Sequence, residues 1–307
     1  MLSFEVIIAV LLQVFTFLNS STSATRSLGS ARSFSESVAQ QSKGQAITHE
    51  DEPRDAEAQY QLGLKYARGA GVTRDDTLAA RLFRKAAEQG HAEAQAALGF
   101  AYHLGRGVQQ SDTEALEWFH KAAEQGQSAA QFNLGFAYFT GAGVPQSDTE
   151  AVTWYRKAAQ QGFAHAENNL GVMYARGRGV KQDFAEAVKW YRKAAEQGIP
   201  DAQTSLGELC ANGDGTPKDD AEAVKWFRNA AEQGYAKAQT NLGRMYESGR
   251  GIPRDTVEAY MWLSLSITEG NGEARSSLSE LEKRMTPAQI AEGERRANAW
   301  LAQHHPQ

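Results

Sequence analysis

Residues 174–198 read YARGRGVKQDFAEAVKWYRKAAEQG, and closely similar text returns along most of the chain. The glycine of a Leu-Gly pair marks the period, which is 36 residues long. It stands at Gly63, Gly99, Gly135, Gly171, Gly207 and Gly243. No insertion or deletion interrupts this series, so the sequence predicts a tandem array of six repeats, in which each unit packs on its neighbours.

Each repeat contains two helical patterns joined by a glycine-rich turn. In the first, Ala166, Leu170 and Tyr174 have the spacing that places side chains on one face of a helix. We expect the adjacent Gly171 to let the backbones of neighbouring helices approach closely. The turn Gly177-Arg178-Gly179 then ends the helix, because glycine tolerates the left-handed cap conformation.

The second helix of each repeat opens with a capping residue in a fixed column, at Asp75, Ser111, Ser147, Asp183, Asp219 and Asp255. Glutamate follows three residues later in five of the six repeats, which predicts a reciprocal capping box. Tryptophan occupies a later column, at Trp118, Trp154, Trp190, Trp226 and Trp262, with Leu82 in the first repeat. We expect the whole tryptophan column to be core.

Composition excludes several classes of protein. The 307 residues include 32 Lys and Arg against 37 Asp and Glu, a formal net charge of −5 that is unlike a strongly basic nucleic-acid binder. Cys210 is the single cysteine, so no disulfide can form within the chain. The array favours one elongated domain over two globular ones.

The N-terminal segment has the pattern of a secretory signal. Residues 4–18 are apolar apart from three positions, and the small residues Thr22 and Ala24 suit a cleavage site. We therefore expect residues 1–24 to be a signal peptide, Thr25 to begin a secreted or periplasmic protein, and no stable membrane insertion after cleavage. An uncleaved anchor is the alternative. Residues 25–54 are rich in Ser, Gln and Ala, which predicts a disordered spacer.

After the array, which we place at residues 55–270, the pattern changes. Ala274 and Leu278 keep the register of a first helix, but no Gly-x-Gly turn follows. Thr286 and Pro287 have the types that begin a helix. We expect residues 271–307 to form a helical cap and tail that cover the apolar face of the last repeat.

The repeated signature Ala-x3-Leu-Gly-x2-Tyr-x2-Gly-x-Gly-Val followed by Ala-x2-Trp-[Phe/Tyr]-x-Lys-Ala-Ala-Glu-Gln-Gly resembles the Sel-one-like repeat family, a branch of the tetratricopeptide superfamily. The resemblance implies an all-α fold, a right-handed α-solenoid of six 36-residue helix-turn-helix repeats with a C-terminal helical cap. It also implies a scaffold for protein–protein interaction, often in exported bacterial proteins that meet host or envelope partners. Cys210 replaces the tyrosine of the fifth repeat, and Leu82 replaces the first tryptophan.

No residue pattern indicates catalysis, a cofactor or a metal. The Gly-x-Gly turns do not lead into Gly-Lys-Ser/Thr, and residues 212–220 lack the glycine and glutamate of a calcium-binding loop. The histidines show no acidic partner at i, i+4 spacing, and His304-His305 is at most a weak metal contact. We expect Cys210, in a core column, to be an inert thiol.

Partner binding must therefore be sought where the repeat does not dictate the residue. First-helix positions beside the core face are apolar and aromatic in the early repeats, and such clusters anchor partner side chains. The predicted contacts are Tyr60, Leu64, Phe100, His103, Phe132, Phe136 and Phe139, with Arg68, Arg176 and Arg244 as secondary polar contacts. Burial of Phe132 and Phe136 against a neighbouring helix stays open.

Two functions follow from these observations. The first is an exported scaffold that binds a peptide or protein in a concave groove, as a host- or envelope-interacting factor. The alternative is a penicillin-binding or β-lactamase-like, cell-wall-active solenoid, as in a cysteine-rich subgroup of relatives. The paired cysteines of that subgroup are missing here, so its activity is not transferred.

Overall fold

The computed structural model describes residues 52–304, in which there are helices and turns but no strands. The predicted signal peptide and nearly all of the spacer lie outside these residues. The chain divides into two compact units between Ala158 and Ala159, and each unit is described by itself.

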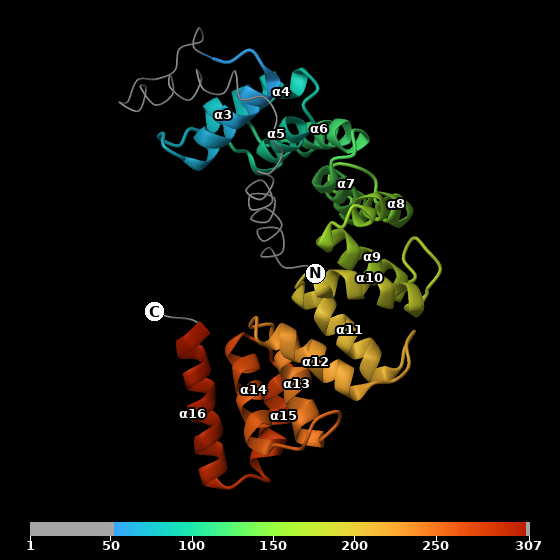
Figure 1. Ribbon diagram of the computed structural model, residues 1–307, viewed down its shortest axis with the longest axis vertical. Coiled ribbons are helices and arrows are strands. Elements are labelled where there is room, and N and C mark those ends of the chain that lie inside the picture. Colours follow the sequence, from blue (N-terminus) through green and yellow to red (C-terminus); the bar gives the residue numbers. More distant parts are fainter. Residues whose placement is uncertain (1–51, 305–307) are drawn as a thin grey trace, which may run out of the picture. The chain divides into compact units, whose positions relative to one another are not determined.

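Unit 1 is built from three antiparallel helix pairs that correspond to the first three repeats (Figure 1). Its helices are α3 (Ala56–Arg68), α4 (Asp76–Glu88), α5 (Ala92–Leu104), α6 (Asp112–Glu124), α7 (Ser128–Thr140) and α8 (Asp148–Gln160). The last two residues of α8 lie after the division between the units. Within unit 1, α4 also packs on α5, and α6 packs on α7.

Unit 2 continues the same arrangement and ends in two further helices. Its helices are α9 (Ala164–Arg176), α10 (Phe184–Glu196), α11 (Pro200–Asn212), α12 (Asp220–Ala231), α13 (Ala236–Ser248), α14 (Thr256–Thr268), α15 (Glu273–Glu282) and α16 (Pro287–His304). The predicted all-α solenoid of helix-turn-helix repeats with a C-terminal helical cap is confirmed.

Helix caps follow the predicted columns, with one correction. The first helices end at glycines in the left-handed conformation, such as Gly177 with φ of 64°. The Asp183 carboxylate accepts from the Glu186 N–H at 3.0 Å, as an N-cap does. The reciprocal capping box is wrong, however, because the Asp183 N–H donates to the Tyr174 carbonyl at 3.0 Å. The same bond recurs in all six repeats, so the first helix satisfies the donor that the glutamate was expected to satisfy.

The alanine and leucine columns form the core. Ala166, Leu170, Ala202 and Leu206 are fully buried, as the spacing predicted. Burial weakens only at the ends of the array, where Ala58 is half-buried because it has fewer neighbours.

The glycine of the Leu-Gly pair makes room mainly for an aromatic ring. A Cβ added at Gly171 would lie 2.7 Å from Cδ1 of Tyr191 in α10, and at Gly207 it would lie 2.6 Å from Cε1 of Phe227 in α12. Both rings are buried. We expected the column to serve the approach of two backbones, and the structure shows that a ring from the second helix fills most of this space.

The tryptophan column is only partly core. Trp154, Trp226 and Trp262 are at most 8 % exposed, but Trp118 and Trp190 are half-buried. In the half-buried pair a lysine one turn later covers the ring, with Lys193 Nζ 4.4 Å from the centroid of Trp190. The prediction that the whole column is buried was therefore wrong for Trp118 and Trp190. The lysine does not decide the difference, since Lys157 lies 3.8 Å from the ring of the buried Trp154 as well.

Glu52 and Pro53, which we assigned to the spacer, contact the first repeat. The Glu52 carboxylate pairs with Arg81 and Lys85 of α4, and its side chain is only 2 % exposed. The Pro53 carbonyl accepts from Gln59 Nε2 at 2.8 Å.

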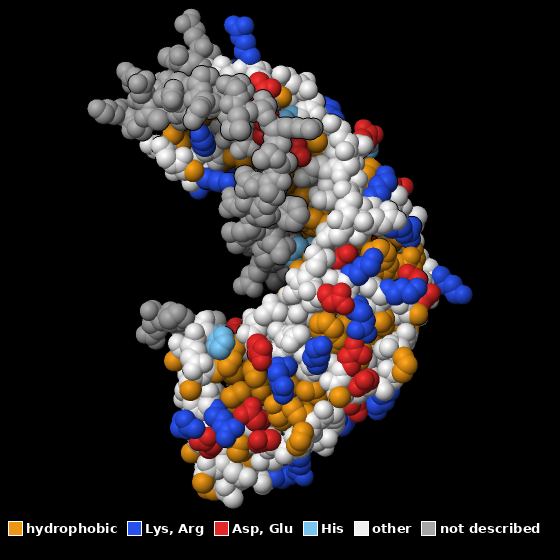
Figure 2. Space-filling view, viewed as in Figure 1, with side chains coloured by type: hydrophobic (Ala, Val, Ile, Leu, Met, Phe, Trp, Pro, Cys, Tyr) orange, Lys and Arg blue, Asp and Glu red, His pale blue; other side chains and the backbone are white. Residues whose placement is uncertain are grey.

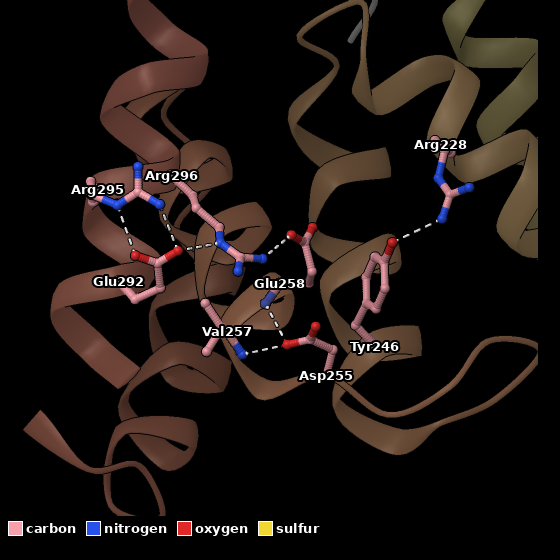
Figure 3. A network of polar contacts seen from close by, with 8 residues as sticks. All are labelled: Arg228, Tyr246, Asp255, Val257, Glu258, Glu292, Arg295 and Arg296. Carbon is pink, nitrogen blue, oxygen red and sulfur yellow. Dashed lines mark hydrogen bonds and ion pairs between the residues drawn. The ribbon is translucent and has the colours of Figure 1, made fainter. Parts of the chain in front are cut away.

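The C-terminal cap is held by apolar packing and by ion pairs, and Figure 3 shows the ion pairs. Arg296 of α16 places Nη1 2.6 Å from Oε1 of Glu258 in α14, and its Nε lies 2.8 Å from Glu292. The Trp300 ring packs edge-on against Trp262, with centroids 6.2 Å apart. The predicted cap therefore covers the last repeat.

Among residues 52–304 no helix combines the length and the apolar character needed to cross a membrane.

Candidate partner-binding surface

Three half-buried phenylalanines lie on the first helices of the second and third repeats. Phe100 is in α5, and Phe136 and Phe139 are in α7. The Phe100 ring packs edge-on against the buried Phe119, with centroids 5.0 Å apart. Phe100 thus combines a fixed inner side with an outer side that water reaches, which is the form of an anchor residue at an interface, and Phe136 and Phe139 share its intermediate burial.

His103 lies one helical turn after Phe100. Its Nδ1 is 2.8 Å from Oδ1 of Asp112, and 38 % of its side chain is exposed. Its backbone carbonyl accepts from Gln110 Nε2 at 2.9 Å. Asp112 therefore orients the imidazole while part of the ring stays accessible.

Three predicted contacts belong to the core instead. Tyr60 is 3 % exposed and packs between the rings of Phe83 and His91. Burial raises the pKa of its hydroxyl. Leu64 is 6 % exposed in the same cluster, and Phe132 is 5 % exposed with its ring 5.7 Å from Tyr155. These side chains are therefore removed from the candidate surface, because a neighbouring helix already covers them.

The three arginines are exposed, and they fall in different units. Arg68 is in α3 of unit 1, whereas Arg176 of α9 and Arg244 of α13 are in unit 2. Arg244 Nε donates to Ser277 Oγ of α15 at 3.3 Å. The structure therefore gives Arg244 a contact within the protein and leaves its role in binding as a prediction.

Sequence reasoning missed Leu104, which is half-buried and follows Phe100 on the same face of α5. The signal was its i, i+4 spacing from Phe100. We define the aromatic surface as Phe100, His103, Leu104, Phe136 and Phe139, all within unit 1.

The corresponding positions of unit 2 carry no aromatic side chain. Val172, Ala175 and Ala211 are apolar, whereas Glu208, Arg244 and Glu247 are charged and each has a partner within unit 2. Glu208 of α11 accepts from Lys237 at 2.8 Å and from Asn241 Nδ2 at 3.1 Å, both in α13. The Tyr235 hydroxyl donates to Asp201. Acidic and basic side chains are interspersed over the visible face of unit 2 (Figure 2). Hydrophobic side chains lie between these charges on the same face (Figure 2).

Cys210 lies among groups that suppress its reactivity. Burial raises the pKa of its thiol to about 11, and the nearby carboxylate of Glu222 adds to the effect. Glu222 accepts from Arg192 at 2.6 Å and from Trp226 Nε1 at 3.3 Å, and these two bonds lower its pKa. A thiol that stays protonated at neutral pH is not a nucleophile.

The described residues hold no group of three or more His, Cys, Asp and Glu side chains that could bind a metal. One step of the sequence reasoning was wrong, since His120 and Glu124 do stand at i, i+4 and lie 3.3 Å apart. In the turn 212–220, Asp219 caps α12 and Asp220 pairs with Arg250 at 2.5 Å. Both carboxylates therefore already have partners within the repeats.

Comparison with known proteins agrees with this geometry. Six consecutive segments match the Sel1 repeat, at residues 56–91, 92–127, 128–163, 164–199, 200–235 and 236–271. The chain belongs to the Sel1 repeat family. Sel1 repeat proteins are generally scaffolds for protein interaction. No match was found among curated protein sequences.

Two solved structures of this family are similar to the chain. A Sel1 repeat protein from Oxalobacter formigenes is 34% identical with a TM-score of 0.63, covering 72% of this chain and 88% of its own. A protective antigen from uropathogenic Escherichia coli with an SLR fold is 31% identical with a TM-score of 0.58, covering 82% of this chain. The match spans 62% of the length of that antigen.

Proposed function

We propose that this Sel1 repeat protein is an exported scaffold whose aromatic surface binds a peptide or protein partner. The observation that carries the proposal is the contrast between the units. The first-helix surface of unit 1 holds half-buried aromatic side chains, whereas the equivalent positions of unit 2 hold aliphatic or charged ones, and the charged Glu208 is paired with Lys237 and Asn241. Apolar anchors of this kind supply most of the binding free energy at protein interfaces.

Export rests on the apolar N-terminal run of the sequence, and the antigen among the similar structures supports it. Intact-mass measurement of the protein recovered from the host culture tests it. We expect the mature chain to begin within a few residues of Thr25. A chain that keeps Met1 would indicate an anchor instead.

The role of the aromatic surface is tested with the double variant Phe136→Ser/Phe139→Ser. The mature wild-type chain is used to capture partners from envelope and host extracts, and the variant is compared with it against the same extracts. Phe184→Ser is the matched control, since Phe184 is also half-buried but lies at the start of α10 in unit 2.

We expect the double variant to lose the proteins that wild type and the control retain, while its circular dichroism melting curve stays close to that of wild type. Equal capture by all three chains would remove the aromatic surface as the site. A double variant that unfolds would show that Phe136 and Phe139 are core residues.

The scaffold function needs no catalytic group. The alternative of a penicillin-binding or β-lactamase-like activity has no support. The relatives credited with that activity are rich in paired cysteines, whereas Cys210 is a lone buried thiol. Hydrolysis of nitrocefin by the purified chain would support the β-lactamase-like alternative.

A further inference from the structure

A column of buried amides ties each first helix to the end of the preceding helix. Gln95, Gln131, Gln203 and Gln239 are at most 5 % exposed. Each Nε2 donates to a backbone carbonyl in the last turns of the previous repeat, those of Ala87, Ala123, Ala195 and Ala231 respectively, at 3.1–3.3 Å. The bond recurs in both units and crosses the same turn each time.

The fourth repeat departs from this column. Glu167, in the first turn of α9, takes the place of the glutamine and is 3 % exposed. Its Oε2 accepts from Gln197 Nε2 at 2.7 Å, just as Oε1 of Gln203 accepts from Gln233 at 2.9 Å. The acceptor half of the glutamine pattern is therefore kept. The donor half is missing, because an ionised carboxylate has no proton to donate.

The charged groups around Glu167 come from α10 and from its own helix. Burial, the largest effect, raises the pKa of Glu167, and Glu196 acts in the same direction. Gln197 and Lys193 oppose it, and so does the positive end of α9. The neighbouring Asn168 is also buried, and its Oδ1 accepts no hydrogen bond.

We propose that Glu167 makes the junction between the turn at residues 159–163 and α9 sensitive to pH. In the ionised state this junction lacks the side-chain hydrogen bond that four other repeats possess. When the carboxyl group is protonated it can donate to the Ala159 carbonyl, the equivalent acceptor, which already accepts from the Gly162 N–H. Mild acid therefore tightens this junction, and neutral pH loosens it.

The direction of the pH dependence follows from the thermodynamic linkage between proton binding and folding. A carboxyl group whose pKa is raised on folding binds its proton more tightly in the folded state, so its contribution is most favourable below the unfolded value of about 4.5. Stability is lost as the pH rises from that value through the raised folded pKa. The junction is thus weakest at neutral pH.

Amide hydrogen exchange on the mature chain tests the proposal, with wild type and variants compared at the same pH. Glu167→Gln restores the donor, so we expect peptides covering residues 159–170 to exchange roughly three- to tenfold more slowly than in wild type at about pH 7. The difference should shrink at about pH 5, where more of the wild-type carboxyl group is protonated.

The mirror variant Gln203→Glu provides the matched control. It places a carboxylate at the same position of the next repeat. Peptides covering residues 195–206 should therefore exchange faster than in wild type at neutral pH, and this difference from wild type should become smaller in acid. Identical exchange of Glu167→Gln and wild type at both pH values would overturn the proposal. A Gln203→Glu variant without pH dependence would do so as well.

Discussion

Arg192 of α10 places Nη1 2.6 Å from Oε1 of Glu222 in α12. The equivalent arginine of the next repeat, Arg228, instead donates to the hydroxyl of Tyr246 at 2.8 Å, and Arg84 does the same to Tyr102 in unit 1. Arg192 has no such hydroxyl to contact, because Cys210 stands in the tyrosine column. A single substitution in one helix thus redirects an arginine to a different helix.

The thiol at this position should be inert in the folded protein. With a pKa of about 11, a fraction of about 10⁻⁴ of Cys210 is thiolate at neutral pH. We expect Ellman's reagent to label it within minutes in denaturant and hardly at all without. Rapid labelling of the native chain would show that the thiol is accessible and ionised.

Tryptophans of the same column should differ in their contribution to stability. We expect Trp226→Ala to cost about 3–5 kcal/mol of unfolding free energy, because Trp226 is 7 % exposed and its loss leaves a cavity. Trp190→Ala should cost roughly 1–2 kcal/mol less, since water already reaches the half-buried ring beside Lys193. Both lie in unit 2, so urea unfolding compares them directly. Equal losses would mean that Trp190 is buried in solution.

Gly171→Ala should destabilise the protein although alanine favours a helix by about 1 kcal/mol. The added Cβ would stand 2.7 Å from the Tyr191 ring, and such overpacking costs about 1–3 kcal/mol. Gly272→Ala is the control, because nothing lies within 4 Å of the Cβ that it would add. Thermal melting of the two variants should therefore separate them, and a Gly171→Ala variant more stable than wild type would contradict the packing.

Arg295 and Arg296 form a matched pair for testing the cap. Arg296→Met breaks the contact between α16 and Glu258, so we expect the melting temperature to fall by roughly 1–3 °C. Arg295→Met should have no measurable effect, because Arg295 pairs only with Glu292 of its own helix (Figure 3). High salt should reduce the difference between the variants. The same melting temperature for both would show that the bond across helices contributes nothing.

Much of the fold could be predicted because its determinants are local or periodic. The left-handed glycine at Gly177 and the N-cap at Asp183 depend on a few consecutive residues, and the burial of Leu170 follows from helical spacing. Periodicity multiplies this information, since one repeat that is understood predicts the other five.

The candidate surface could be predicted only in part. Phe132 and Phe136 stand one helical turn apart, yet Phe132 is buried against Tyr155 and Phe136 is half-buried. Spacing places both on one side of α7, but the position of the next helix decides which of them it covers.

The sequence by itself determined the repeat, its two helices, their caps and the leucine core, because local conformation and amphipathic spacing are written within one unit. Only the tertiary structure decided that the Asp183 N–H donates to Tyr174 and that Arg192 contacts Glu222. It also decided that Trp226 is buried whereas Trp190 is only half-buried. Each of these outcomes depends on which groups compete for one donor or one surface after the helices have packed.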